Sequence, residues 1–226
     1  MGHIEAARPP AERSFLRDFL GEAEEWAQGR MWIPRALLIA YLVYADYRFL
    51  RDPLSSTMFS GITLAFHEMG HLLFGFTGHF IGSLMGSGMQ VLVPVVVIVI
   101  FSRQPDYFGM SVGGFWLSFS LFELASYVGD ARAMELPLVG FSDDPEHDWH
   151  YLLSTTHLLP FDTTFAFLIR VAATVIGMAS LAFAVWLMTK MLRRQDSALC
   201  SSGRSSPAHH ESPRRGWRVW PGRDRG

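Results

Sequence analysis

The stretch GMQVLVPVVVIVIF, residues 88–101, is apolar almost throughout and lies inside a longer run, 83–102, that carries no charged residue. A helix needs about 20 predominantly apolar residues to cross the hydrocarbon of a bilayer. Pro94 is compatible with such a helix, because neighbouring helices in a membrane can satisfy the carbonyl that a proline leaves free. This stretch therefore predicts a transmembrane helix.

Four further apolar runs of similar length accompany it, at 32–50, 57–78, 107–130 and 163–192. Hydrophobic residues make up 50% of the 226-residue chain and charged residues 18%, below the roughly one quarter that is usual in soluble domains. We therefore expect an all-α fold, a polytopic membrane helix bundle of about five transmembrane helices. The run at 32–50 is the weakest of the five, because Asp46 and Arg48 interrupt it.

Composition divides the chain into three regions. Residues 1–30 form an N-terminal juxtamembrane segment in which 12–28 has the spacing of an amphipathic helix, lying either on a membrane surface or in solvent. Residues 31–192 form the membrane-embedded domain, including the one long loop, 131–162. Residues 193–226 are rich in Arg, Ser and Pro, which predicts a disordered basic tail.

The charges suggest an orientation. With five spans, the short loops that carry Arg51 and Arg103 lie on the same face as the basic tail, so the positive-inside rule predicts a cytoplasmic C-terminus in a bacterial-type cytoplasmic membrane. The N-terminal segment and the loop 131–162 then lie together on the outer face. A net charge of −2 makes nucleic acid a poor partner, and the single cysteine, Cys200, excludes an intrachain disulfide and a thiolate metal site.

The second run contains TLAFHEMGHLLFGF, residues 63–76, which places His67, Glu68 and His71 in an apolar segment. Residues four apart lie on the same face of a helix, so the two histidines can present their ring nitrogens to one metal ion. This HExxH spacing is typical of zinc hydrolases, in which the glutamate accepts a proton from water. Each polar group costs about 2 to 3 kcal/mol in hydrocarbon unless it has a partner, so we expect Zn²⁺ here. A metal-free core of hydrogen-bonded polar side chains is the alternative.

The element HEMGH, in an apolar span with Gly61, Gly70, Gly75 and Gly78, resembles the site-2 protease family of intramembrane zinc metalloproteases. The resemblance covers residues 57–134. It implies that His67 and His71 bind zinc, that Glu68 is the catalytic base, and that an aspartate on a later span is the third ligand. It further implies hydrolysis of peptide bonds in a membrane protein or peptide substrate within the lipid bilayer.

For the third ligand the stretch FELASYVGDARAMELP, residues 122–137, offers two carboxylates on one helix face. The resemblance favours Asp130, and we predict Asp130 as the ligand. Depth in the membrane favours Glu123, which can instead accept a hydrogen bond from a ligand histidine. His147 and His150 of the segment HDWH are alternative sources of ligands, whereas His79 is expected at the membrane interface.

Two other functional classes fit the same residues. In a non-catalytic metal-binding scaffold, the histidines bind a metal ion but no substrate is converted. A transporter places ionisable residues along an ion path through the bundle, whereas here they gather near one site. A regulatory partner protein is compatible with each of these readings, because the chain shows no separate peptide-binding domain.

Overall fold

The computed structural model describes residues 15–137 and 146–202, and every element in those ranges is a helix. Seven α-helices are described, with two short 3₁₀ turns, η1 (Gly75–Thr77) and η2 (Leu159–Phe161): α1 (Phe15–Ala27), α2 (Ile33–Arg51), α3 (Ser60–Phe74), α4 (His79–Arg103), α5 (Tyr107–Gly129), α6 (Asp148–Thr155) and α7 (Asp162–Ser202). The all-α prediction is confirmed for this part of the chain.

Each of the five apolar runs forms a helix, but the prediction of five membrane spans is not confirmed. Three stretches of the described chain are long and apolar enough to cross a membrane: α4, α5, and 159–193 of η2 and α7. The 15 residues of α3 extend only about 22 Å, short of a hydrocarbon core of about 30 Å. In α2 the charges of Arg35, Asp46, Arg48 and Arg51 break up the apolar sequence.

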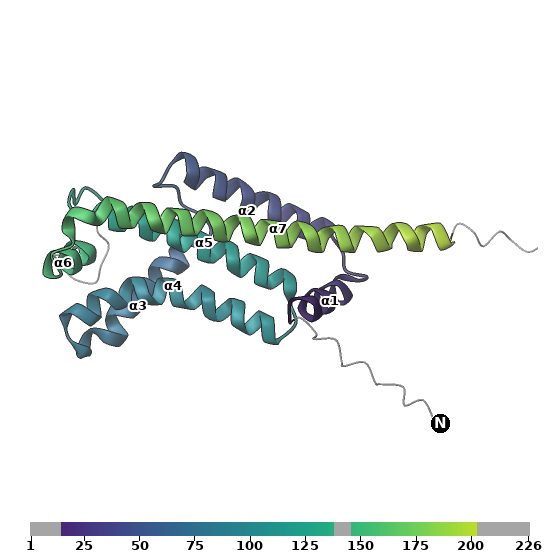
Figure 1. Cartoon of the computed structure of the whole chain (residues 1–226), viewed down its shortest axis with the longest axis horizontal. Helices are drawn as coiled ribbons and strands as arrows, with labels where there is room; N and C mark the ends of the chain where they lie inside the picture. The colour runs from purple at the N-terminus through teal and green to yellow at the C-terminus, as the bar shows by residue number, and fades with distance from the viewer. Residues whose placement is uncertain (1–14, 138–145, 203–226) are drawn as a thin grey trace, which may run out of the picture.

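Helix α5 lies at the centre of the bundle, packed against α2, α4 and α7 (Figure 1). Phe115 and Phe119 on α5 are fully buried, and Phe119 stacks on Phe49 of α2 with ring centroids 5.7 Å apart. Aromatic rings bury large apolar areas, so this cluster is a main source of packing energy for the bundle. Helices α3, α4 and α6 also pack against this central helix.

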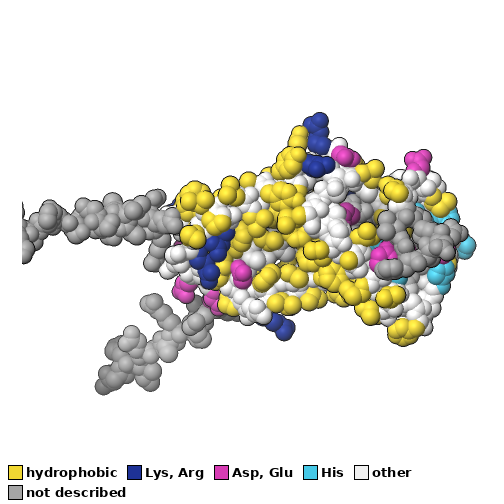
Figure 2. Space-filling view, turned by 180° about the vertical axis from the view of Figure 1, so that it is seen from behind, with side chains coloured by type: hydrophobic (Ala, Val, Ile, Leu, Met, Phe, Trp, Pro, Cys, Tyr) yellow, Lys and Arg dark blue, Asp and Glu magenta, His cyan; other side chains and the backbone are white. Residues whose placement is uncertain are grey.

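The outer faces of α4 and α7 remain apolar and exposed. Val95, Val99, Val171 and Val175 are among the exposed large side chains on these two helices. Figure 2 shows hydrophobic side chains over the middle of one face of the molecule, with histidines gathered at one end. Such a belt fits contact with lipid, which supports a membrane protein.

The amphipathic pattern at 12–28 forms α1, which packs on the bundle. Ala23 and Ala27 are fully buried against Tyr107 and Leu187, while Leu16 stays exposed. At the other end of the chain, α7 continues past the boundary that we expected at residue 193, to Ser202. The remainder of the predicted disordered tail lies outside the described residues.

The expectation that the N-terminal segment and the loop 131–162 share one face does not hold. Glu24 of α1 pairs with Lys190 of α7 at 2.8 Å, and the Tyr107 hydroxyl at the start of α5 donates to Glu22 at 3.0 Å. Helix α6, from the loop, lies at the opposite end of the bundle (Figure 1). Four full crossings would have returned the chain to its starting face, but α3 covers only part of the length of the bundle.

Candidate metal centre

Helix α3 presents His67 and His71 side by side, with ring centroids 4.8 Å apart. The helix can lie close to α4 because Gly70, between the two histidines, has no side chain. A Cβ at this position would collide with the backbone carbonyl of Met85 on α4. The glycine in HEMGH therefore serves the packing that brings the histidines against α4.

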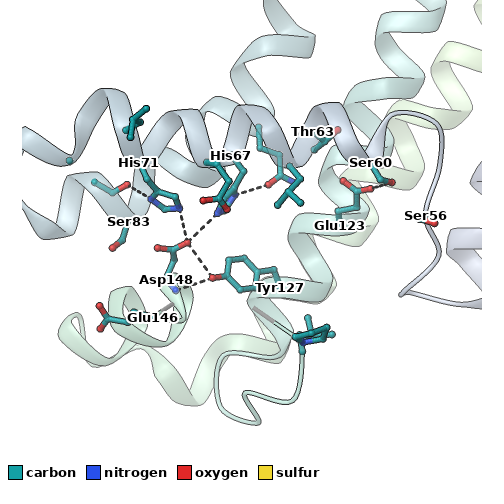
Figure 3. A pocket seen from close by; sticks show the side chains of 18 of the residues that line it. Ser56, Ser60, Thr63, His67, His71, Ser83, Glu123, Tyr127, Glu146 and Asp148 are labelled. Atoms are coloured by element: carbon teal, nitrogen blue, oxygen red, sulfur yellow. Dashed lines mark hydrogen bonds and ion pairs between the residues drawn. The ribbon is translucent and has the colours of Figure 1, made fainter. Parts of the chain in front are cut away.

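The third member of the group is Asp148, the first residue of α6. Its Oδ2 lies 3.2 Å from Nε2 of His67 and 3.2 Å from Nε2 of His71 (Figure 3). The three candidate ligand atoms all lie within 4.8 Å of one another, and His67 and Asp148 are buried. Two histidines and one carboxylate from distant parts of the sequence thus form a donor set that suits zinc.

The opposite ring nitrogens of the histidines face hydrogen-bond acceptors. His71 Nδ1 lies 3.0 Å from the carbonyl oxygen of Gly82, and His67 Nδ1 lies 3.1 Å from Oε1 of Gln90. The Gln90 amide is itself oriented, because its Nε2 donates to the Ser120 carbonyl at 2.9 Å. These acceptors favour the proton on Nδ1, which leaves the Nε2 lone pairs directed at Asp148. Two lone pairs beside a carboxylate repel it unless a proton or a cation lies between them.

Helix α4 keeps space free beside both Nε2 atoms. A Cβ on Gly86 would lie 2.5 Å from His71 Nε2 and 2.9 Å from His67 Nε2. Gly82, Gly86 and Gln90 are four residues apart and therefore share the face of α4 that meets α3. One face of α4 thus supplies two acceptors and the gap between them, so the donor set and the space fit a metal ion.

Asp148 is held in its ionised form. Burial raises the pKa of its carboxyl group. Without a metal ion, hydrogen bonds donated by protonated His67 and His71 rings lower the pKa by more than burial raises it, so that it falls to about 2. The Tyr127 hydroxyl also donates to Oδ2 at 3.2 Å and accepts the Asp148 backbone N–H at 3.0 Å. A carboxylate in this state is the form that binds a metal.

Asp130, the ligand predicted from sequence, does not join the group. It follows the last residue of α5, and its carboxylate accepts the backbone N–H groups of Glu135 and Leu136, both at 3.0 Å. Its Oδ2 lies 3.4 Å from Nε2 of His147. The Asp130 carboxylate therefore stabilises the turn after α5. Asp148 is the carboxylate that lies against both histidines.

The other candidates also lie apart from the group. Glu123 accepts a hydrogen bond from the Ser60 hydroxyl. His150 Nδ1 lies 2.8 Å from the carbonyl oxygen of Ala131, and His79 pairs with Glu146 at 2.9 Å. His147 precedes α6, where its Nδ1 accepts the His150 backbone N–H at 3.2 Å, and burial lowers the pKa of its ring.

A cavity of about 840 Å³ opens beside the histidines. Glu68, His67 and Asp148 line it, and all three are buried. Leu54, Leu64 and Leu72 supply apolar wall. Gly113 and Gly114 of α5 do not line this cavity. A Cβ at these positions would meet Ile98 and Ser180, so the two glycines allow close helix packing.

Sequence reasoning missed Asp148, although it singled out the segment HDWH for its two histidines. The usable signal was a carboxylate inside a His- and aromatic-rich stretch of the one long loop. Comparison of the chain with protein-family models, curated proteins and solved structures found no match. The family resemblance therefore rests on the HEMGH element.

Proposed function

We propose that this protein is a zinc-dependent intramembrane metallopeptidase, with His67, His71 and Asp148 as ligands and Glu68 as the catalytic base. The observation that carries the proposal is the pair of Nε2 atoms that face one carboxylate oxygen while acceptors occupy both Nδ1 atoms. Three protein ligands are the number found in catalytic zinc sites, whereas structural zinc sites use four.

Bound zinc would supply a Lewis acid and lower the pKa of a water ligand from about 15.7 toward about 7. Glu68 directly follows the first ligand and lines the cavity, where it would accept the proton of the attacking water. It would then pass that proton to the departing amine. Tyr127 would keep Asp148 oriented through its two hydrogen bonds.

The proposed setting is a lipid bilayer, with a multi-pass bundle built from the three apolar spans and with α2 and α3 packed among them. The C-terminus would lie in the cytoplasm. The substrate would be a membrane protein or peptide, and its segment would have to unwind to expose a peptide bond, because helical amides are closed within the helix. The cavity volume of about 840 Å³ suits a few residues of unwound chain.

The test measures zinc content and peptide cleavage by the purified full-length protein. We expect about one zinc per chain in the wild type, loss of zinc in Asp148→Ala, and full zinc content in Glu68→Gln with cleavage lowered by at least about 100-fold. Cleavage by Glu68→Gln at the wild-type rate would refute the catalytic base. Zinc binding without cleavage of any membrane peptide by the wild type would favour a non-catalytic metal-binding protein, and a wild type without zinc would refute the site.

A further inference from the structure

The cavity extends beyond the metal group to a second polar region, formed by Glu123 of α5 and Ser56, Ser60 and Thr63 at or near the start of α3. Figure 3 shows Glu123 and Ser60 together on the side of the cavity away from His71. The proposed reaction uses none of these four residues. Glu123 is the one acidic side chain of this region.

The Glu123 carboxylate has little compensation for its charge. Its one hydrogen bond comes from the Ser60 hydroxyl, and no Lys, Arg or His nitrogen of the described residues lies within 4.0 Å of it. Leu54 and Leu64 line the same cavity. A partly buried carboxylate with a single neutral partner gains free energy when a cation reaches it.

The distance between Glu123 and the metal group suits a side chain of a bound peptide substrate. Glu123 precedes Tyr127 by one helical turn, about 6 Å along α5, and Ser60 precedes His67 by two turns, about 10 Å along α3. An extended chain rises about 3.3 Å per residue, so this interval corresponds to two or three residues. A lysine or arginine within three residues of the bond at the metal group can therefore reach Glu123.

We infer that Glu123 and Ser60 form a specificity site that binds a cationic side chain of the substrate, lysine or arginine, close to the bond that is cleaved. The inference rests on the proposed function and names the class of substrate. Glu123 accepts hydrogen bonds from the ammonium or guanidinium group, and Ser60 orients the carboxylate. The cation then fixes which peptide bond lies beside His67 and His71.

The experiment measures binding to the zinc-loaded full-length protein in detergent, independently of turnover. The probes are three pairs of short peptide hydroxamates, in which the hydroxamate binds zinc and the first, second or third residue is lysine or uncharged norleucine. The proteins are the wild type, Glu123→Gln, which keeps an acceptor for Ser60, and Asp46→Asn as a matched control. Asp46 also accepts a hydrogen bond from a serine of another helix, Ser118, at 3.2 Å, but it does not line the cavity.

For at least one pair, we expect the lysine peptide to bind the wild type at least about tenfold more tightly than the norleucine peptide, the effect of one charge-assisted hydrogen bond. Glu123→Gln should lose this preference and keep its affinity for norleucine, whereas Asp46→Asn should keep the preference. Equal binding of lysine and norleucine in every pair, or a preference that survives in Glu123→Gln, would overturn the inference and leave the metal site intact. If no hydroxamate binds the zinc-loaded wild type, both the proposed function and the inference are refuted.

Discussion

At the scale of single residues, the site is defined by the contacts that each histidine makes through its two ring nitrogens. Gly82 and Gln90 face the Nδ1 atoms, which leaves Nε2 of His67 and His71 available to the proposed metal ion. Such acceptors fix the ring orientation and raise the basicity of the ligand nitrogen. Both acceptors come from α4, so α4 helps to orient the two histidines although it contributes none of the three candidate ligands.

Gly86 allows a direct test of the space beside those nitrogens. In Gly86→Ala, the new methyl group would lie 2.5 Å from His71 Nε2, so we expect zinc affinity to fall about 10- to 100-fold, the usual effect of overpacking by a methyl group. The measurement is competition for zinc against a chelator of known affinity. Gly61→Ala is the matched control, because a Cβ at 61 meets nothing within 4 Å. Unchanged affinity in Gly86→Ala would place the metal elsewhere.

The same residues show what the sequence can predict about the site. The proximity of His67 and His71 follows from helical periodicity, which five consecutive residues of the sequence are enough to show. Asp148 joins the group only because α6 packs against α4 and contacts α3, and 76 residues separate Asp148 from His71 in the sequence. No local sequence pattern predicts such long-range packing. Asp130 had the chemistry of a ligand, but its carboxylate serves two backbone N–H groups of its own turn.

At the scale of secondary structure, α6 is the element that completes the donor set. Its N-terminal end is held by His147, which stacks on Tyr127 with ring centroids 4.4 Å apart and faces Asp130. Further along, the Trp149 indole N–H donates to Ser87 of α4 at 2.9 Å. We therefore expect Asp130 to help position Asp148, since it lies against His147, the residue that precedes α6.

We predict that Asp130→Asn retains one zinc per chain but binds it about 10- to 100-fold more weakly, as is usual when a group that supports a metal ligand is altered. Asp148→Asn, in contrast, should lose stoichiometric zinc. Chelator competition on the two purified variants distinguishes the roles. A complete loss of zinc in Asp130→Asn with normal binding in Asp148→Asn would restore the assignment made from the sequence.

At the scale of the whole molecule, the sequence predicts the positions of the long helices, whereas the prediction of five membrane crossings is not confirmed. Hydropathy located α2, α3, α4, α5 and α7, because each apolar run is long enough for a helix. Hydropathy could not show how short α3 is, since the apolar run 57–78 continues past the end of the helix at Phe74 into η1, which begins at Gly75. The N-terminal helix α1 consequently lies at the end of the bundle opposite α6 (Figure 1).

This arrangement predicts the sidedness of three positions in a membrane. Helix α7 has 41 residues and extends about 60 Å, twice the thickness of the hydrocarbon core, so its C-terminal end, with Cys200, must emerge beyond the end where Glu24 of α1 meets Lys190. We expect a membrane-impermeant maleimide to label Cys200 from one side. In a Cys200→Ser background, Leu16→Cys on α1 should be labelled from that same side, and Glu146→Cys, beside α6, from the other. Leu16 is 66% exposed, which makes it a suitable reporter. Labelling of Leu16→Cys and Glu146→Cys from one common side would contradict the packing of α1 on α7 and restore the topology with five full crossings.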